Sequence, residues 1–133
     1  MNRVEIIGAE KQDVRAALER LGSATLGESG GIPLDSRIGP MWSTASFAAP
    51  VYAVSCRPGD NLGLHVAVTT APAGSALAVD VGGIAERGYW GEVLTRAAQA
   101  AGVVALVIDG GVRDTAALEE LGFPVFASCV ALP

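Results

Sequence analysis

The segment formed by residues 88–114 constrains the fold of this chain more than any other part of the sequence. It begins with glycine, tyrosine and tryptophan, and it ends with the run Asp-Gly-Gly-Val-Arg-Asp. Between these ends, apolar residues recur at the spacing of one face of an α-helix: Trp90, Val93, Leu94, Ala97, Ala98 and Ala101. Gly102 is placed to end that helix, because glycine adopts the left-handed conformation without steric cost.

A buried strand is predicted directly after this helix. Residues 103–108 form a continuous apolar run with three valines and one isoleucine, which is typical of a strand buried on both faces of a parallel sheet. We expect the glycine-rich residues 109–111 to end the strand in a tight turn. That turn would present Arg113 and Asp114 at the exit of the strand.

The rest of the chain alternates between predicted helices and strands, which indicates an α/β fold built as a single layered domain. Helices are predicted at residues 13–21, 60–70 and 115–121, and Asp60 is a candidate N-cap. Strands are predicted at residues 50–56, 76–81 and 124–130, with a shorter strand around Ser46 and Phe47 within residues 41–49. Residues 23–40 are rich in glycine, serine and proline and are expected to be irregular.

Residues 76–108 form one βαβ unit at the centre of this arrangement. Its crossover should be right-handed, so that its two strands run parallel. The glycine-rich loop at residues 82–91 and the residues at 109–114 then lie at the same edge of the sheet. Ligands of open parallel sheets bind at that carboxyl edge.

Composition argues against several classes of protein. The chain has 133 residues, half of them apolar, which suits one domain with a real core. Its net charge is -5 and it has no basic stripe, so nucleic-acid binding is not expected. It has neither a signal peptide nor a run of about 18 apolar residues, so no membrane span is expected and the protein should be cytoplasmic. Cys56 and Cys129 are expected to be buried free thiols, and a disulfide between them stays an alternative.

The glycine-rich loop before the central helix has two interpretations. Gly83 and Gly88 have the spacing of a P-loop, but Tyr89 and Trp90 replace the residues that hold phosphate and magnesium, so nucleotide binding is disfavoured. The backbone amides between Gly88 and Gly91 can nevertheless approach an anion at the helix N-terminus. The alternative is a tight turn that only packs the helix on the sheet.

Arg113 and Asp114 are the sharpest candidates for a functional site. An arginine can bind a carboxylate or an oxyanion through a fork of hydrogen bonds, and an adjacent aspartate can hold magnesium while water and substrate oxygens complete the shell. Alternatively, Asp114 caps the next helix and Arg113 is a surface residue. Glu92 lies in the first turn of its helix, where the dipole favours a carboxylate, and the topology brings it to the same edge.

Other candidates are weaker. Asp80 and Asp109 lie near the ends of two buried strands, where each can act at the edge or bind loop amides. His65 is the only histidine, so a Ser-His-Asp triad would require it. Because no GxSxG motif accompanies it, we interpret it as a packed or surface residue. Trp42 and Trp90 are expected in the core or in a contact between subunits.

Several motifs in this sequence resemble the RraA-like family. They are residues 23–28 (SATLGE), residues 58–62 (PGDNL), and residues 90–114 with LGFPVFA after them. The family includes regulators of ribonuclease activity and divalent-metal-dependent 4-hydroxy-4-methyl-2-oxoglutarate / 4-carboxy-4-hydroxy-2-oxoadipate aldolases, and members are often labelled demethylmenaquinone methyltransferase-like. The aldolase branch has an acidic residue, twenty intervening residues and then Arg-Asp, a pattern matched here by Glu92, Arg113 and Asp114.

The resemblance implies a class II aldolase mechanism in which Asp114 coordinates Mg²⁺ or Mn²⁺. Arg113 would donate a hydrogen bond to the keto oxygen of a pyruvyl substrate and stabilise the enolate, and Glu92 would orient a metal-bound water. The backbone amides that would bind the substrate carboxylate belong to Gly88, Tyr89, Trp90 and Gly91. Oxaloacetate decarboxylation passes through the same pyruvate enolate and is expected as a second activity.

The resemblance also implies a layered fold of the swivelling β/β/α type, assembled as a homotrimer or a dimer of trimers with sites at the subunit boundaries. Residues 1–133 are expected to form one such domain that lacks the C-terminal extension usual in relatives. Two alternatives to the aldolase stay open. One is a non-catalytic regulator that binds a ribonuclease or another protein partner, and the other is an inactive, shortened homologue that serves only in assembly.

Overall fold

The structure of the protein is a computed structural model that describes residues 11–132. It divides into two compact units, Met1–Pro33 and Leu34–Pro133. In the first unit, helix α1 (Lys11–Glu28) is interrupted at Gly22, where φ is 74° and ψ is 156°. The predicted break at Gly22 is confirmed. The prediction of irregular structure is wrong for residues 23–28, because the chain returns to a helix after the glycine.

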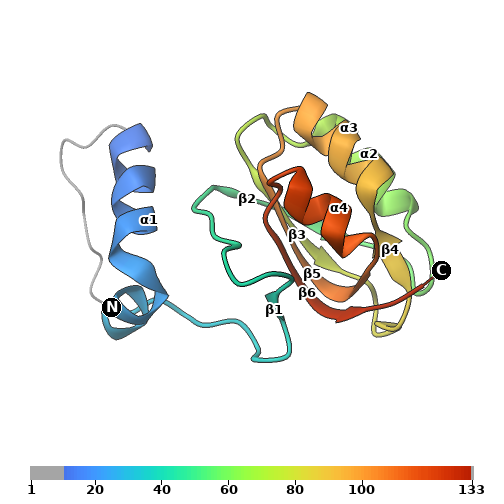
Figure 1. Ribbon diagram of the computed structural model, residues 1–133, viewed down its shortest axis with the longest axis horizontal. Coiled ribbons are helices and arrows are strands. Elements are labelled where there is room, and N and C mark those ends of the chain that lie inside the picture. Colours follow the sequence, from blue (N-terminus) through green and yellow to red (C-terminus); the bar gives the residue numbers. More distant parts are fainter. Residues whose placement is uncertain (1–10, 133) are drawn as a thin grey trace. The chain divides into compact units, whose positions relative to one another are not determined.

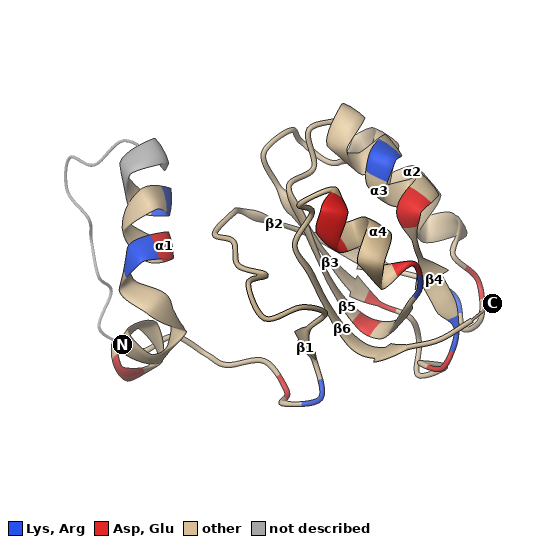
Figure 2. Cartoon of the chain, viewed as in Figure 1, with Lys and Arg blue, Asp and Glu red and all other residues tan. Residues whose placement is uncertain are grey.

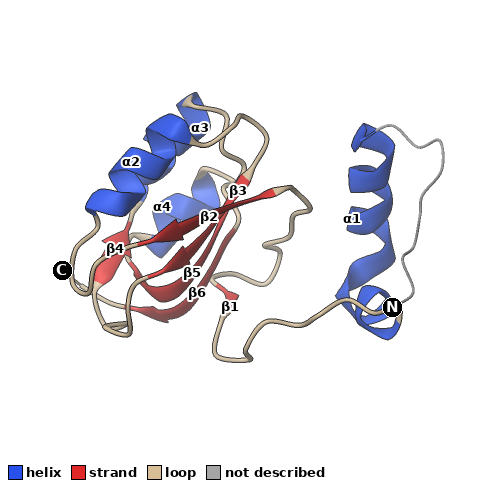
Figure 3. Ribbon diagram, turned by 180° about the vertical axis from the view of Figure 1, so that it is seen from behind, coloured by secondary structure: helices blue, strands red, loops and turns tan. Residues whose placement is uncertain are grey.

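The second unit is built on a six-stranded sheet with the strand order β1-β6-β5-β3-β2, and β4 lies beside β5. The strands are β1 (Gly39–Pro40), β2 (Val51–Ser55), β3 (Ala76–Asp80), β4 (Gly88–Trp90), β5 (Ala105–Val112) and β6 (Val125–Val130). The helices of this unit are α2 (Leu62–Thr70), α3 (Glu92–Ala100) and α4 (Thr115–Glu120). They pack on one face of the sheet (Figures 1 and 3). The α/β fold class is confirmed.

The predicted βαβ unit is present. Strands β3 and β5 are parallel, with paired residues from Ala76 and Ala105 to Asp80 and Asp109, and α3 lies between them in the sequence. Strand β2 pairs in parallel with the other side of β3. The loops that follow β2, β3 and β5 therefore meet at one edge of the sheet, where open parallel sheets bind their ligands.

Strand β5 continues through its glycines, so the predicted tight turn at residues 109–111 is wrong. The strand extends to Val112, and its second half pairs with β4. A Cβ atom on Gly111 would lie only 2.6 Å from the carbonyl oxygen of Arg87. Glycine is needed here because the loop before β4 passes too close to the strand for any side chain.

Trp90 lies in β4, so its predicted place on the helical face is wrong. Its indole is fully buried, and Nε1 donates a hydrogen bond to Thr95 Oγ1 over 2.7 Å. The ring stacks on Phe123 with 5.9 Å between the centroids. Helix α3 is thereby rotated relative to the prediction, and Val93 is 78% exposed instead of buried. The residues of α3 that are buried are Leu94, Thr95 and Ala98.

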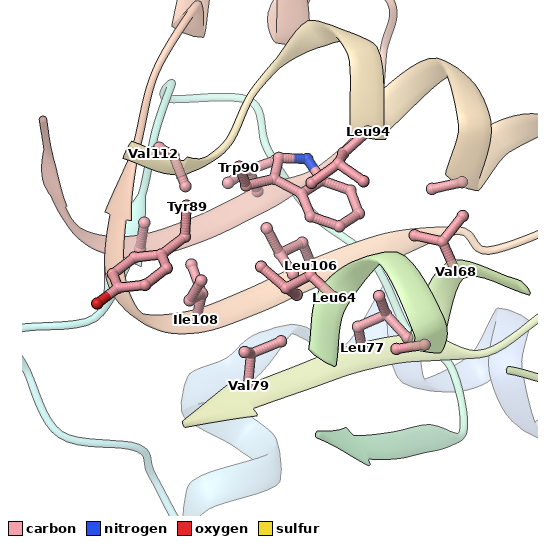
Figure 4. Close-up of a cluster of buried hydrophobic side chains, with 14 of the residues drawn as sticks. Leu64, Val68, Leu77, Val79, Tyr89, Trp90, Leu94, Leu106, Ile108 and Val112 are labelled. Atoms are coloured by element: carbon pink, nitrogen blue, oxygen red, sulfur yellow. The ribbon is translucent and has the colours of Figure 1, made fainter. Parts of the chain in front are cut away.

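The core lies between the sheet and the helices that cover it (Figure 4). Leu64 of α2 and Leu94 of α3 pack with Leu106 and Ile108 of β5 in one buried cluster. Burial of each such side chain stabilises the fold by about 1.5–3 kcal/mol. Trp42 is partly buried against the same cluster. This packing fixes the N-terminal ends of α2 and α3 relative to the carboxyl edge of the sheet.

Residues 39–49 are arranged differently from the prediction. No strand forms within residues 41–49, and the expected strand around Ser46 and Phe47 is wrong. Instead, Gly39–Pro40 pairs in antiparallel fashion with β6. Proline is tolerated there because β1 lies at the edge of the sheet. Phe47 packs edge-on against Phe126 of β6, with 5.7 Å between the ring centroids.

Two further expectations concern the thiols and the membrane. Cys56 and Cys129 are both free, as predicted, although Cys129 is only partly buried. Burial raises the pKa of the Cys56 thiol. Within residues 11–132, every helix is too short or too polar to cross a lipid bilayer.

Candidate functional site

Arg113 and Asp114 follow β5 at the carboxyl edge of the sheet, as the sequence predicts. The backbone N–H of Arg113 donates a hydrogen bond to the carbonyl oxygen of Trp90 over 2.8 Å, which ties the exit of β5 to the end of β4. Asp114 has φ 57° and ψ 34°, and it is the one non-glycine residue with positive φ in the described part of the chain. Aspartate tolerates this left-handed region better than most residues.

The side chain of Asp114 points toward the start of α3. Asp114 occupies the N-cap position of α4 but makes no side-chain capping hydrogen bond. Its Oδ2 atom accepts a hydrogen bond from the backbone N–H of Glu92 over 3.1 Å instead. The N-terminus of a helix favours a negative charge. The capping alternative therefore explains the position of Asp114 but not the orientation of its carboxylate.

Gly91 provides the space that these two side chains occupy. A Cβ atom on Gly91 would lie 2.5 Å from Asp114 Oδ2 and 3.0 Å from Arg113 Nε. The backbone of Gly91 is extended, with φ -158° and ψ -164°, which other residues adopt readily. Glycine is thus required here for space and not for conformation.

Arg113 carries an unsatisfied donor. Its Nε atom is buried and has no hydrogen-bond partner among the described residues. The nearest carboxylate oxygen, Asp114 Oδ2, is 3.9 Å away, which is beyond hydrogen-bond distance. A buried donor without an acceptor is unfavourable in the free protein.

Two cavities meet at Arg113. The larger has a volume of about 290 Å³ and is lined by Gly59, Asp60, Asn61, Arg87, Gly88, Tyr89 and Arg113. The smaller has a volume of about 170 Å³ and is lined by Asn61, His65, Gly91, Val93, Leu94 and Arg113. Figure 2 shows residues of both charge signs on the loops beside β4. The larger cavity is at the lower end of the range for small-molecule sites.

The loop before α2 belongs to this site, although sequence reasoning gave it no role there. Asn61 Nδ2 donates a hydrogen bond to the carbonyl oxygen of Tyr89 over 3.2 Å, and Gly59 N–H donates to Tyr89 Oη over 3.1 Å. Tyr89 Oη in turn donates to the carbonyl oxygen of Ile84 over 2.5 Å. The available signal was the PGDNL segment directly after β2, because parallel pairing of β2 and β3 brings it to the same edge. Asp60 Oδ1 accepts from Leu62 N–H over 2.8 Å.

Glu92 reaches the site through its backbone. Its N–H group binds Asp114, whereas its carboxylate forms an ion pair with Arg96 one turn along α3, at 2.8 Å. The structure thus brings Glu92, Arg113 and Asp114 to one edge, as the topology predicts. The Glu92 side chain has a partner on its own helix.

Two of the backbone amides predicted to bind a carboxylate already have hydrogen-bond partners. Gly88 N–H donates to the carbonyl oxygen of Leu132 over 3.2 Å, and Tyr89 N–H donates to the carbonyl oxygen of Arg87 over 2.9 Å. The side chain of Trp90 lies in the core. Carboxylate binding by the amides of residues 88–91 stays a prediction.

Asp80 and Asp109 have structural partners. Asp80 Oδ1 accepts a hydrogen bond from Gly82 N–H over 2.8 Å, which is the loop-amide role left open by the sequence. Asp109 instead binds Arg37, whose Nε donates to Oδ1 over 3.0 Å and whose Nη2 donates to Oδ2. This bond to the guanidinium lowers the pKa of Asp109. His65 is exposed and lines the smaller cavity.

The residues present fit a divalent cation bound through one carboxylate. In residues 11–132 no group of three or more His, Cys, Asp or Glu side chains could hold a metal ion. Magnesium does not require such a group, because it commonly retains several waters and takes one or two carboxylates plus substrate oxygens. Asp114 is about half exposed, and only its Oδ2 atom is engaged, by Glu92.

Comparison with known proteins gives a family match over most of the chain. The family model described as RraA-like (Aldolase/RraA) matches residues 13–132. A protein of Halalkalibacterium halodurans named "Putative 4-hydroxy-4-methyl-2-oxoglutarate aldolase" is 31% identical over 93 residues. The match covers 70% of this chain and 44% of that protein, so the chain spans less than half the length of this relative.

Solved structures show the same fold. The RNA-processing inhibitor RraA from Thermus thermophilis is 27% identical with a TM-score of 0.69, and the match covers 83% of this chain and 68% of that chain. RraAS2 from Streptomyces coelicolor, described as an unusual member of the RNase ES inhibitor RraA protein family, is 24% identical with a TM-score of 0.74. That match covers 92% of this chain and 65% of that chain.

Proposed function

This chain belongs to the RraA-like (Aldolase/RraA) family, and on that premise we propose that it is a divalent-metal-dependent lyase of small 2-oxo acids. The proposed reaction cleaves substrates of the 4-hydroxy-4-methyl-2-oxoglutarate type to pyruvate. Decarboxylation of oxaloacetate is the proposed second activity. The name of the Halalkalibacterium halodurans relative supports this class of reaction.

One observation carries the proposal. The buried Nε of Arg113 has no hydrogen-bond partner in the described residues, and it lies beside the Asp114 carboxylate where two cavities meet. In this proposal, Arg113 serves as the donor and Asp114 as the cation ligand for the same small molecule. A structural arginine on the surface would not need a buried, unsatisfied donor.

The chemistry requires such a pair. In the aldol cleavage, the C3–C4 bond breaks, its electron pair forms the enolate of pyruvate, and the C4 hydroxyl loses a proton as it becomes a carbonyl. Arg113 donates to the C2 oxygen as negative charge develops there. Removal of one such donor typically costs about 3 kcal/mol of barrier. Asp114 would hold Mg²⁺ or Mn²⁺, which would supply positive charge to stabilise the developing enolate.

The remaining roles are assigned to neighbouring residues. Of the amides predicted to bind the substrate carboxylate, those of Trp90 and Gly91 are proposed to do so, because the N–H groups of Gly88 and Tyr89 already donate to the carbonyl oxygens of Leu132 and Arg87. Gly91 additionally gives Arg113 and Asp114 their space. Glu92 is proposed to orient a water that accepts the proton of the C4 hydroxyl and returns a proton to C3 of the enolate. Its ion pair with Arg96 holds the carboxylate near the start of α3.

The test is release of pyruvate by the purified chain. We expect pyruvate from 4-hydroxy-4-methyl-2-oxoglutarate and from oxaloacetate with Mg²⁺ or Mn²⁺, none above background with a chelator, and at least about a hundredfold loss in Arg113→Gln. Arg20→Gln, an exposed arginine of α1, is the matched control and should retain activity. Absence of metal-dependent release from folded protein would contradict the proposal.

A second candidate function is a regulator that binds a ribonuclease or another protein. The observation that favours it is the structural likeness to the Thermus thermophilis RNA-processing inhibitor. This function predicts retention of a ribonuclease partner that is unaffected by Asp114→Asn and independent of metal. The lyase instead predicts metal-dependent pyruvate release that is lost in Asp114→Asn.

We further propose a homotrimer or a dimer of trimers and a cytoplasmic location. The oligomeric state follows from the family resemblance, and the location is the one expected from the sequence. Analytical ultracentrifugation of the chain tests the oligomeric state directly.

A further inference from the structure

We propose that the cavity of about 290 Å³ is a subsite for a second carboxylate of the substrate, and that Arg87 binds that carboxylate. This proposal rests on the proposed function, because it takes Arg113 and Asp114 as the place of the keto group. It makes Arg87 the residue that selects 2-oxo dicarboxylic acids over 2-oxo monocarboxylic acids.

The placement of the cavities carries the first step. Arg113 lines both cavities, whereas Arg87 lines only the larger one. A ligand whose keto oxygen is bound by Arg113 can therefore extend in two directions. The direction that enters the larger cavity leads to a second guanidinium, and a guanidinium binds a carboxylate through parallel hydrogen bonds.

The guanidinium of Arg87 is available for a ligand. Among the described residues, no carboxylate lies within 4.0 Å of it, in contrast to Arg15, Arg37 and Arg96, which all have ion-pair partners. The group lies next to Gly59, where an added Cβ would be 3.7 Å from Arg87 Nε. Arg87 is exposed and lies against the backbone of the loop before α2, without an ion-pair partner among the described residues.

The backbone that carries Arg87 is well fixed. Its N–H donates to the carbonyl oxygen of Ala85 over 2.8 Å, and its carbonyl oxygen accepts from Tyr89 N–H over 2.9 Å. That carbonyl group also lies against Gly111, where a Cβ would be only 2.6 Å away. Because these contacts hold the backbone of Arg87, binding of its guanidinium to a ligand costs only the conformational entropy of the side chain.

The charges of the larger cavity suit an anion. Its charged side chains are Arg87, Arg113 and Asp60, so two positive groups face one negative group in a chain whose net charge is -5. Without Arg87, the Asp60 carboxylate would face the second carboxylate of the substrate with only Arg113 to offset it. Loss of Arg87 should thus affect dicarboxylates far more than monocarboxylates.

The experiment compares two probes by calorimetry in the presence of Mg²⁺ or Mn²⁺. Oxalate resembles the enolate of pyruvate and tests the Arg113–Asp114 end alone. 2-Oxoglutarate adds a distal carboxylate but is not cleaved. In Arg87→Gln, we expect the Kd of 2-oxoglutarate to rise by at least about tenfold and that of oxalate to change by less than about twofold.

Two variants complete the design. Arg57→Gln removes an exposed positive charge from the same loop region without lining the larger cavity, and it should leave both Kd values unchanged. Arg87→Lys keeps the charge but loses the fork, and it should restore part of the affinity for 2-oxoglutarate. Circular dichroism at increasing temperature confirms that each variant is folded.

The outcomes separate this inference from the proposed function. If the wild-type protein binds oxalate but Arg87→Gln binds 2-oxoglutarate as tightly as the wild type, the subsite is overturned and the proposed function stands. Equal weakening of both probes in Arg87→Gln also overturns the subsite. If the wild-type protein binds neither probe, the proposed function fails and the subsite fails with it.

Discussion

The backbone N–H of Glu92 donates a hydrogen bond to Asp114 Oδ2 over 3.1 Å. This bond joins the first residue of α3 to the residue that follows Arg113 after β5. It fixes the Asp114 carboxylate at a helix N-terminus, where negative charge is favoured.

Gly91→Ala should disable the site while the fold persists. The added Cβ would lie 2.5 Å from Asp114 Oδ2, so the carboxylate and Arg113 must move. We expect at least about a hundredfold loss of pyruvate release and a destabilisation of about 1–3 kcal/mol. Gly39→Ala is the control, because nothing lies within 4 Å of a Cβ placed there. Full activity in Gly91→Ala would show that the placement of these side chains is unimportant.

Asp114→Asn should separate metal binding from folding. Asparagine keeps an oxygen that can accept the Glu92 N–H bond, and it tolerates the positive φ of 57°. Its neutral amide is a much poorer ligand for Mg²⁺. We expect an unfolding free energy within about 0.5 kcal/mol of the wild type and loss of metal binding by calorimetry. Glu120→Gln, an exposed carboxylate of α4, should preserve binding.

The ion pair between Arg37 and Asp109 should make the free energy of unfolding depend on pH in the acidic range. Arg37 lowers the pKa of Asp109 below its ordinary value of 3.8. The folded state therefore binds the proton more weakly than the unfolded state. The ion pair therefore stabilises the folded state fully above pH 3.8, and this stabilisation is lost as pH falls through the lowered pKa of Asp109 in the folded state.

Urea unfolding across this pH range checks the prediction. Asp109→Asn should be less stable than the wild type at pH 7, and the difference should shrink as pH falls below 3.8. Arg37→Gln should behave in the same way, and the double variant should add little to either change, because both variants remove one interaction. A difference between wild type and Asp109→Asn that is constant with pH would contradict this account.

Thr95→Val should destabilise the core. The hydroxyl of Thr95 accepts the hydrogen bond of the buried Trp90 Nε1 over 2.7 Å, and valine has nearly the same shape without an acceptor. An unpaired buried N–H costs about 1–3 kcal/mol. Thr95→Ser retains the hydroxyl and should recover much of the loss, as measured by urea unfolding. Equal stability of Thr95→Val and wild type would show that this bond contributes nothing.

Most elements of the Leu34–Pro133 unit could be predicted from the sequence, because each is encoded by residues within the element or directly beside it. Strand β3, strand β6 and the end of α3 at Gly102 follow from apolar runs and from glycine, and Gly102 indeed has φ 84°. The glycines of β5 misled the prediction. Glycine at a strand end usually indicates a turn, whereas Gly111 is required by the close approach of Arg87, a contact between distant residues.

The parts of the candidate site that depend only on the strand topology could be predicted from the sequence. Parallel pairing of β3 and β5 brings Glu92, Arg113 and Asp114 to one edge, and this holds in the structure. The bond between Asp114 and the Glu92 backbone was not predictable, because it depends on the positive φ of Asp114. Asn61 was missed because its role depends on β2 pairing beside β3.

The most direct test of the central claim is the exchange of pyruvate methyl protons with deuterium, followed by ¹H NMR. Exchange requires only the enolate, so it isolates the work of Arg113 and Asp114 from any second substrate. The account predicts exchange that depends on Mg²⁺ or Mn²⁺ and falls by at least about a hundredfold in Arg113→Gln and in Asp114→Asn. Exchange by the folded wild-type protein no faster than with the metal ion alone would contradict it, and so would wild-type rates of exchange in Arg113→Gln and Asp114→Asn.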